Sequence, residues 1–290
     1  MPFRRSHARS TRYRRRTTRR VTRRPARRTI TRRRPTRNGY NSRRRILNIA
    51  STKKQDNMLP VVAANDGTST VPGPLTINGN QPMMLLWCAT ARDRVSNVGR
   101  DNASSVRESD LVYMRGLKEK INITTTTQAS WHWRRICFTA KGVNQFLTAL
   151  DSLETSAGWV RLLTNINNTT SGNNILGYVF KGTQGVDWYD AFTAKVDTNR
   201  VSIKYDQTRN FSSGNAQGRY FKHKNWFPMN QNLMYSNDEA GESESNDNHS
   251  TLGRAGMGDY YVLDFITCAT NQSADTMLFT PEATLYWHEK

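Results

Sequence analysis

The sequence predicts an all-β protein: an eight-stranded double-sheet jelly roll with short helices in its loops and a disordered, arginine-rich N-terminal arm. Two observations predict this class. Eight segments after residue 80 have the composition of strands, and the basic charge is concentrated before residue 55. The roughly 235 residues after the arm suit one domain, because all-β sandwiches and barrels commonly reach about 200–250 residues undivided. We therefore expect a basic arm at 1–54 and a jelly-roll domain at 55–290.

The arm is defined by its charge. Twenty arginines lie in the first 45 residues without a lysine or an acid among them, and Lys53 and Lys54 follow before the first acid, Asp56. The chain has 43 basic and 23 acidic residues. The arm holds 22 of the basic residues and none of the acidic ones, so 21 basic and 23 acidic residues remain after it. A polycationic arm on a near-neutral body indicates a dense polyanion as the partner.

The composition of the arm predicts disorder in the free protein. Its few apolar residues follow no period and its like charges repel, so too little apolar surface is buried to offset chain entropy. Guanidinium binds phosphate through two parallel N–H bonds, which favours nucleic acid as the partner. Phe3, Tyr13 and Tyr40 either stack on bases or are incidental. The arginines expected to contact nucleic acid are Arg4, Arg5, Arg9, Arg12, Arg14, Arg15, Arg16, Arg19, Arg20, Arg23, Arg24, Arg27, Arg28, Arg32, Arg33, Arg34 and Arg37.

Other uses of an arginine-rich segment fit these residues less well. A mitochondrial presequence is amphipathic, whereas Thr and Pro separate the triplets Arg14–Arg16 and Arg32–Arg34 and leave no apolar helical face. Binding to a membrane surface would need interleaved Trp, Leu or Phe. No apolar run is long enough to span a bilayer and no signal peptide opens the chain, so we expect no membrane partner. Dense basic clusters also serve as nuclear import signals.

Eight segments have strand character. In 199–206, Val201, Ile203 and Tyr205 fall on one face and polar residues on the other, and 119–126 alternates in the same way. Eight strands joined by long loops suit a double-sheet jelly roll, whereas an immunoglobulin-like sandwich would be shorter and more evenly spaced. The predicted strands are 83–91, 110–126, 131–140, 175–181, 199–206, 217–227, 259–269 and 276–288.

Two short helices are expected between the strands. Apolar residues from Phe146 to Leu153 have helical spacing within 143–153, and 186–196 is the second candidate. Before the strands, residues 46–80 have the character of a transition, broken by Asn-Asp-Gly and Pro-Gly-Pro.

The chain lacks the motifs of common nucleotide and metal chemistry. It has no P-loop, and the spaced glycines of 253–258 precede a strand instead of a helix, which is typical of a turn. No two histidines are at i, i+2 or i, i+4, and no cysteine lies near one at ligand spacing. We expect no enzyme activity, no cofactor and no metal site, although a triad assembled from distant residues stays open. The cysteines, which lie far apart in apolar stretches and are expected to be buried and reduced, are Cys88, Cys137 and Cys268.

Two segments have more than one interpretation. Strand 131–140 begins WHWRR, which places its tryptophans and Arg135 on one face and His132 and Arg134 on the other. Either the tryptophans are core residues beside a polar face, or His132 and Arg134 contact packaged nucleic acid. The acidic stretch at 238–247 is a solvated loop, a divalent-ion site between subunits or a loop that keeps an outer surface anionic, and its spacing does not match a calcium loop.

Several stretches together have a pattern that resembles one family. They are Arg43–Asn48 running into Ser51–Met58, Tyr113–Ile121, Trp131–Phe138 and Gly256–Val262. The chain resembles, over nearly its whole length, the capsid protein of genomoviruses, the small circular single-stranded DNA viruses that include the gemycircularviruses.

The resemblance implies a jelly-roll protein that forms a small icosahedral, T = 1-like shell around circular single-stranded DNA. By similarity the arm arginines contact DNA without reading its sequence, and no catalytic residue is implied. Arg43, Arg44, Arg45, Lys53 and Lys54 are assigned to nuclear import, as in geminivirus coat proteins, which makes host import receptors partners and the virion and host nucleus the locations. If about 60 copies each present about 20 positive charges, they neutralise on the order of a thousand phosphates.

Two other functions share part of this evidence. A cellular nucleic-acid-binding protein of ribosomal or chromatin type would share the arm but would carry basic residues over its folded surface, against which the near-neutral body argues. A nucleic-acid enzyme such as a replication initiator would need the nucleotide-loop and metal-histidine motifs that the sequence lacks.

Overall fold

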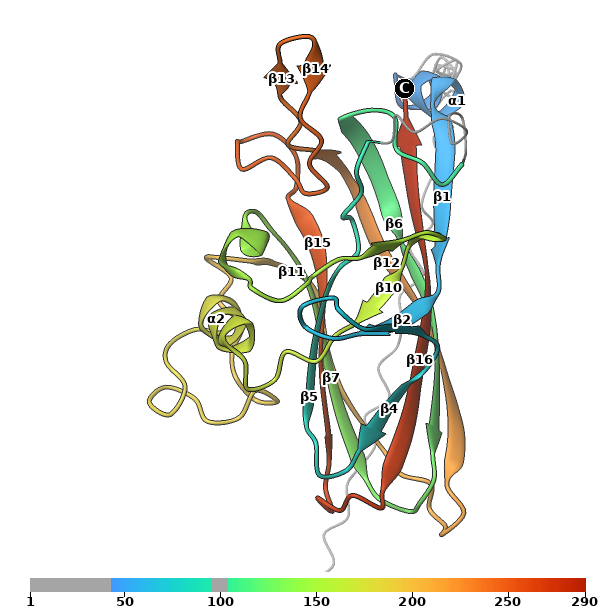
Figure 1. The fold of residues 1–290 in the computed structure, drawn as a ribbon, viewed down its shortest axis with the longest axis vertical. Coiled ribbons are helices and arrows are strands. Elements are labelled where there is room, and N and C mark those ends of the chain that lie inside the picture. Colours follow the sequence, from blue (N-terminus) through green and yellow to red (C-terminus); the bar gives the residue numbers. More distant parts are fainter. Residues whose placement is uncertain (1–42, 95–103) are drawn as a thin grey trace, which may run out of the picture. The chain divides into compact units, whose positions relative to one another are not determined.

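Two antiparallel sheets pack face to face in the computed structural model, which describes residues 43–94 and 104–290 (Figure 1). The first sheet has the order β1-β16-β6-β12, and β4 pairs with the part of β16 that β1 leaves free. The second sheet has the order β11-β7-β15-β5. The strands of the first sheet are β1 (Thr52–Met58), β4 (Leu75–Asn78), β6 (Leu111–Thr125), β12 (Arg219–Met234) and β16 (Thr276–Glu289). The strands of the second sheet are β5 (Met83–Cys88), β7 (Trp131–Ala140), β11 (Ser202–Phe211) and β15 (Asp259–Cys268).

The strand order is that of a double-sheet jelly roll. With β4 set aside, the eight strands of the two sheets, counted along the chain, read first-eighth-third-sixth in one sheet and second-seventh-fourth-fifth in the other. All pairings within the two sheets are antiparallel. The chain therefore crosses repeatedly between the sheets, as in paired Greek keys. The predicted all-β class and jelly-roll fold are confirmed.

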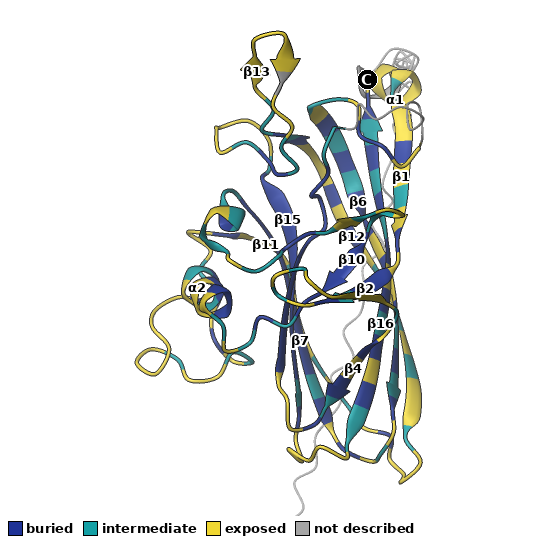
Figure 2. Cartoon of the chain, in the orientation of Figure 1, coloured by how far each residue is buried: buried dark blue, intermediate teal, exposed yellow. Residues whose placement is uncertain are grey.

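The two sheets differ in how many of their faces are covered. Residues of β5 and β15 are buried almost without interruption, because α2 (Thr170–Val179) and its flanking loops cover the face of the second sheet that points away from the first. The strands of the first sheet instead alternate buried and exposed residues (Figure 2). One face of the first sheet is therefore open to solvent, which is common in antiparallel sheets.

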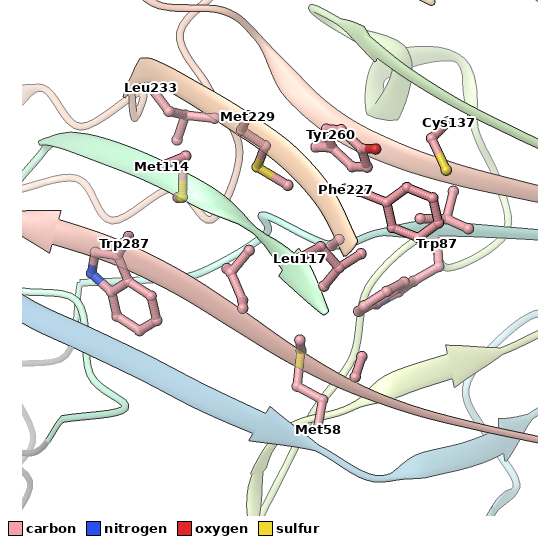
Figure 3. Packing of buried hydrophobic residues seen from close by; sticks show 14 of the residues in the cluster. Met58, Trp87, Met114, Leu117, Cys137, Phe227, Met229, Leu233, Tyr260 and Trp287 are labelled. Atoms are coloured by element: carbon pink, nitrogen blue, oxygen red, sulfur yellow. The ribbon is translucent and has the colours of Figure 1, made fainter. Parts of the chain in front are cut away.

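The core lies between the sheets. Leu117 of β6 and Phe227 of β12 pack in one cluster with Trp87 of β5 and Tyr260 of β15 (Figure 3). A second inter-sheet cluster includes Trp131 of the second sheet and its apolar neighbours on β6 and β16. The three cysteines are buried and unpaired, as predicted.

A buried ionic cluster ties the sheets together within this core. Arg135 of β7 donates to both oxygens of Asp264 of β15 at 2.7 Å, and also pairs with Glu119 of β6. Arg161, the first residue of the short strand β10 (Arg161–Leu163), donates to Glu119 and Asp264 at 3.0 Å each. Trp133 Nε1 donates to Asp264 at 2.8 Å. Burial alone would raise the pKa of Asp264, but the two guanidinium groups and the indole hold it below its usual value.

Seven of the eight predicted strand segments are strands, with different ends: β11 runs on to Phe211 and β12 to Met234. The prediction at 175–181 is wrong, because these residues belong mostly to α2. Thr169 caps this helix by accepting a hydrogen bond from the Gly172 N–H at 3.1 Å. Ile175 and Val179, four residues apart, form its buried face, and a short apolar run does not distinguish a buried strand from such a helix.

Neither predicted helix forms as expected. Only one 3-10 turn, η2 (Val143–Phe146), occupies the start of 143–153, and Leu147 is extended. Phe146 packs outside the second sheet, whereas Leu150 packs against the core between the sheets, so the segment cannot present one helical face. The segment 186–196 consists mainly of turns, with isolated bridges at Trp188 and Val196.

The predicted transition at 46–80 is largely structured. It contains most of α1 (Arg43–Ala50) and the strands β1 to β4, and the compact unit begins at Ile46. The arm was therefore predicted to extend too far, since Thr52–Lys54 lie in β1. The sequence TKKQDNM has little strand character of its own, and β1 forms because all seven residues pair with β16.

Short elements complete the fold. The acidic stretch at 238–247 contains a small hairpin of β13 and β14. No helix among the described residues is both long and apolar enough to cross a membrane. The short strands are β2 (Pro60–Ala63), β3 (Thr70–Pro72), β8 (Glu154–Thr155), β9 (Gly158–Trp159), β10 (Arg161–Leu163), β13 (Glu239–Ala240) and β14 (Ser243–Glu244).

Candidate nucleic-acid interface

The open face of the first sheet carries lysines from two neighbouring strands. Lys118 and Lys120 of β6 and Lys222 and Lys224 of β12 are exposed, and strand alternation places them all on this side. The register sets Lys120 directly opposite Lys224. Like charges directly opposite one another destabilise a sheet, so this pairing costs stability in the isolated domain.

Basic residues outnumber acidic ones on this surface by six to one. The single carboxylate is that of Glu282 in β16, opposite Lys120 in register. Among the described residues, no carboxylate lies within 4.0 Å of the amino groups of the four lysines on β6 and β12. The surface therefore keeps an uncompensated positive charge. Its basic residues, which define what we call the basic face, are Lys53, Arg115, Lys118, Lys120, Lys222 and Lys224.

Exposed aromatic rings lie among these charges. Tyr220 is 55% exposed and Trp226 is 50% exposed, at the two ends of the β12 lysine pair. The Trp226 ring lies over Gly116, where an added Cβ would come within 2.7 Å of it, and its centroid is 5.8 Å from that of Tyr286. Rings held flat beside lysines can stack bases while the lysines contact phosphate, a combination used by proteins that bind single strands.

His288 reports the positive potential of this face. It lies on β16 between Lys53 of β1 and Tyr113 of β6 in register. Partial burial, and then the nearby charges of Arg115 and Lys53, lower the pKa of His288 below its ordinary value. Both causes disfavour the protonated imidazole, so His288 takes up a proton less readily than a free histidine.

The predicted nucleic-acid contact at Arg134 is not supported by its position in the fold. Its guanidinium is buried, pairs with both oxygens of Asp206 at 2.9 and 2.7 Å, and donates to the carbonyl oxygens of Ala191 and Ala194. Its donors are therefore occupied within the fold. His132 is only partly exposed, donates through its ring Nδ1 to the Asn210 side-chain oxygen at 2.8 Å, and packs edge-on near Phe192. The first interpretation of the strand, core tryptophans beside a polar face, fits the structure.

The predicted import residues are split by the fold. Lys54 is buried, with its Nζ 2.6 Å from Glu108 and 3.6 Å from Glu289, so it is not accessible to an import receptor. Lys53, the residue before it in β1, is exposed on the opposite face of the strand from Lys54. The backbone of Arg43–Arg45 begins α1. The predicted DNA contacts from Arg4 to Arg37 lie outside the described residues.

Three residues of the types found in nucleophilic triads do come together, contrary to the expectation from their spacing. Cys88, Asp151 and His249 are buried and their ligand atoms lie within 4.8 Å of one another. Burial raises the pKa of the Cys88 thiol to about 11. Burial in apolar surroundings is typical of an unreactive, structural cysteine.

The basic face was missed by sequence reasoning, although a signal for it was present. Lys120, Asn122 and Thr124 visibly alternate with Ile121 and Ile123, and Lys222 and Lys224 are likewise two residues apart. What the sequence did not show is that β6 and β12 are neighbours, because more than 90 residues separate them in the chain.

The fold and this surface together define the class of the molecule as an all-β jelly roll with one open, basic sheet face. No protein-family model matches the chain, and no curated protein matches it. The function therefore has to be argued from the arm, the fold and the basic face themselves.

We expect replacement of three face lysines to weaken binding to single-stranded DNA. In the variant Lys120→Gln, Lys222→Gln and Lys224→Gln, the slope of log K against log salt should become shallower by about 2, since each phosphate that a cation neutralises contributes ~0.7. Fluorescence anisotropy with a labelled oligonucleotide at several salt concentrations measures this slope. The matched control is Lys181→Gln, Lys195→Gln and Lys204→Gln, three exposed lysines outside the first sheet. Equal slopes for the two variants would show that the basic face does not contact DNA.

Proposed function

We propose that this chain is a structural capsid protein of the genomovirus type, which assembles into a small icosahedral shell and packages circular single-stranded DNA. Jelly rolls are common in viral shells, but fold alone does not define function. The proposal rests on the combination of this fold with two separate polycationic features, the arm and the basic face.

The observation that carries the proposal is the one-sided charge of the jelly roll. The body is near neutral, yet six basic residues and one acid occupy the open face of the first sheet. The arm leads in sequence into β1, a strand of this same sheet. In the proposed shell the basic face lines the interior, and the arm and the sheet bind the same nucleic acid.

The charges suit a small genome. The basic face has a net charge of about five, which over about 60 copies adds a few hundred phosphate contacts to the thousand or so available to the arms. Because lysines, flexible arginines and aromatic rings all contact backbone or base faces, the packaging is independent of sequence.

Assembly tests the proposal directly. The purified full-length chain is mixed with circular single-stranded DNA and examined by electron microscopy and analytical ultracentrifugation. We expect closed particles of uniform size at moderate salt. A chain that stays monomeric at every salt concentration and pH, with and without DNA, would refute a capsid function.

The basic face also favours a second candidate, a cellular nucleic-acid-binding protein, since that function requires basic residues on the folded surface. The two candidates differ in their products. A cellular binding protein gives open complexes whose size grows with DNA length, whereas a capsid protein gives particles of one size with DNAs of different length.

We also propose that the arm directs nuclear import together with Arg43, Arg44, Arg45 and Lys53, but without Lys54. In a fluorescent fusion with the upstream arginines neutralised, Ala replacements at Arg43–Arg45 and Lys53 should shift the protein from nucleus to cytoplasm. Lys54→Ala should instead lower stability, because it removes the cation that lies 3.6 Å from the buried Glu289 carboxylate. Nuclear accumulation of the first variant at the parent level would contradict this assignment.

A further inference from the structure

Three side chains of the types that bind transition metals meet inside the domain. They lie on the side of the second sheet that points away from the first sheet, and so away from the basic face. Cys88 ends β5, Asp151 lies in the loop after η2, and His249 precedes β15. They are 2%, 6% and 7% exposed, and their ligand atoms all lie within 4.8 Å of one another. No other group of three such residues is found among the described residues.

The separations are close to those of a tetrahedral metal site. His249 Nε2 lies 3.0 Å from one oxygen of Asp151 and 3.3 Å from the other. Zinc–ligand bonds of about 2.0–2.3 Å place tetrahedral ligand atoms roughly 3.3–3.8 Å apart. Side-chain adjustments of about 1 Å would therefore seat an ion between the three groups.

The surroundings hold each ligand in place. The Cys88 N–H donates to the Asp151 carbonyl oxygen at 2.7 Å, which joins the two segments through the backbone. Ser152 and Tyr261 hydroxyls donate to the Asp151 carboxylate at 3.0 and 3.4 Å. The backbone N–H of His249 donates to the Asp247 carboxylate. The same carboxylate lies 3.8 Å from the Nδ1 atom of the His249 ring. A carboxylate beside the second ring nitrogen is the usual outer partner of a metal-binding histidine.

The ligand set selects the metal by charge and softness. A thiolate and a carboxylate neutralise a divalent ion, which suits a site at the edge of an apolar cluster. Sulfur and imidazole ligands favour zinc over magnesium or calcium. We propose that Cys88, Asp151 and His249 bind one Zn²⁺ ion per chain, which cross-links β5 to the loops that precede β8 and β15. This site is independent of the proposed capsid function.

Metal analysis of the full-length, tag-free chain tests the site. We expect about one zinc per chain by mass spectrometry after exposure to equimolar Zn²⁺, and zinc should raise the melting temperature. Substitution with Co²⁺ should give a thiolate-to-cobalt charge-transfer band, which reports a cysteine ligand without any mutation. Failure of the folded parent chain to retain zinc, or a cobalt spectrum without this band, would overturn the proposal.

Variants assign the ligands. Cys88→Ser and His249→Asn should each weaken zinc binding at least tenfold, and Cys88→Ser should abolish the cobalt band. Cys137→Ser is the matched control, because Cys137 is equally buried but lies in the inter-sheet core. Retention of the band in Cys88→Ser, or its loss only in Cys137→Ser, would refute the assignment.

Discussion

Replacing Asp264 by Asn should destabilise the folded chain by about 3–5 kcal/mol, because removing one member of a buried ionic cluster leaves uncompensated charge in the core. Asp264 accepts hydrogen bonds from Arg135, Arg161 and Trp133. In the variant, Glu119 alone would face both guanidinium groups, each of which is fully buried. Urea unfolding of unassembled protein at high salt, followed by tryptophan fluorescence, measures the loss.

The control for this prediction is Asp197→Asn. Asp197 lies 3.5 Å from Arg200; the Asp197 side chain is 13% exposed and that of Arg200 is 52% exposed, so this partly exposed pair should contribute at most about 1 kcal/mol. If Asp264→Asn were no more destabilising than Asp197→Asn, the buried cluster would not be holding the two sheets together.

Neutralising the arm should have the largest effect on nucleic-acid binding. Replacing the seventeen arginines from Arg4 to Arg37 by Gln should make the salt slope for single-stranded DNA shallower by up to about 12, at ~0.7 for each phosphate that is no longer neutralised. Affinity at moderate salt should fall by roughly a thousandfold or more. The same anisotropy titration measures both quantities, and the basic face should provide the residual binding.

A scrambled arm separates charge from sequence. A chain whose first 42 residues are reordered, with every arginine kept, should bind and assemble like the parent because the arginines bind phosphate. Two results together would contradict this: the scrambled chain loses binding, and the Gln variant keeps the parent's slope of log K against log salt. They would mean that the arm recognises a specific partner through its sequence instead of condensing DNA through its charge.

Local patterns predicted much of the fold but not its boundaries. Strands such as β6 and β16 were predictable because alternation and β-branched residues are local properties. The strand β1 was not, because its polar sequence becomes a strand only by pairing with β16. The helix α2 was mistaken for a strand because a short apolar run fits either structure, and the burial pattern that decides between them depends on the sheet beneath it.

For the candidate sites, too, local patterns predicted one part and tertiary packing decided the rest. Of the two interpretations of strand 131–140, contact of Arg134 with nucleic acid is the one its position does not support, because exposure depends on which neighbours cover a residue. Arg134 lies under the segment after α2 and pairs with Asp206, whereas nothing among the described residues neutralises the two lysines.

The sequence by itself determined the polycationic arm, the near-neutral body, the reduced cysteines and the all-β class, since charge, composition and short-range alternation are carried by neighbouring residues. The tertiary structure alone decided that Lys54 is buried, that Lys120 meets Lys224, and that Cys88 meets Asp151 and His249. Each of these depends on strand pairing or loop packing between residues far apart in the chain, which is determined by the arrangement of the whole jelly roll and not by any local pattern.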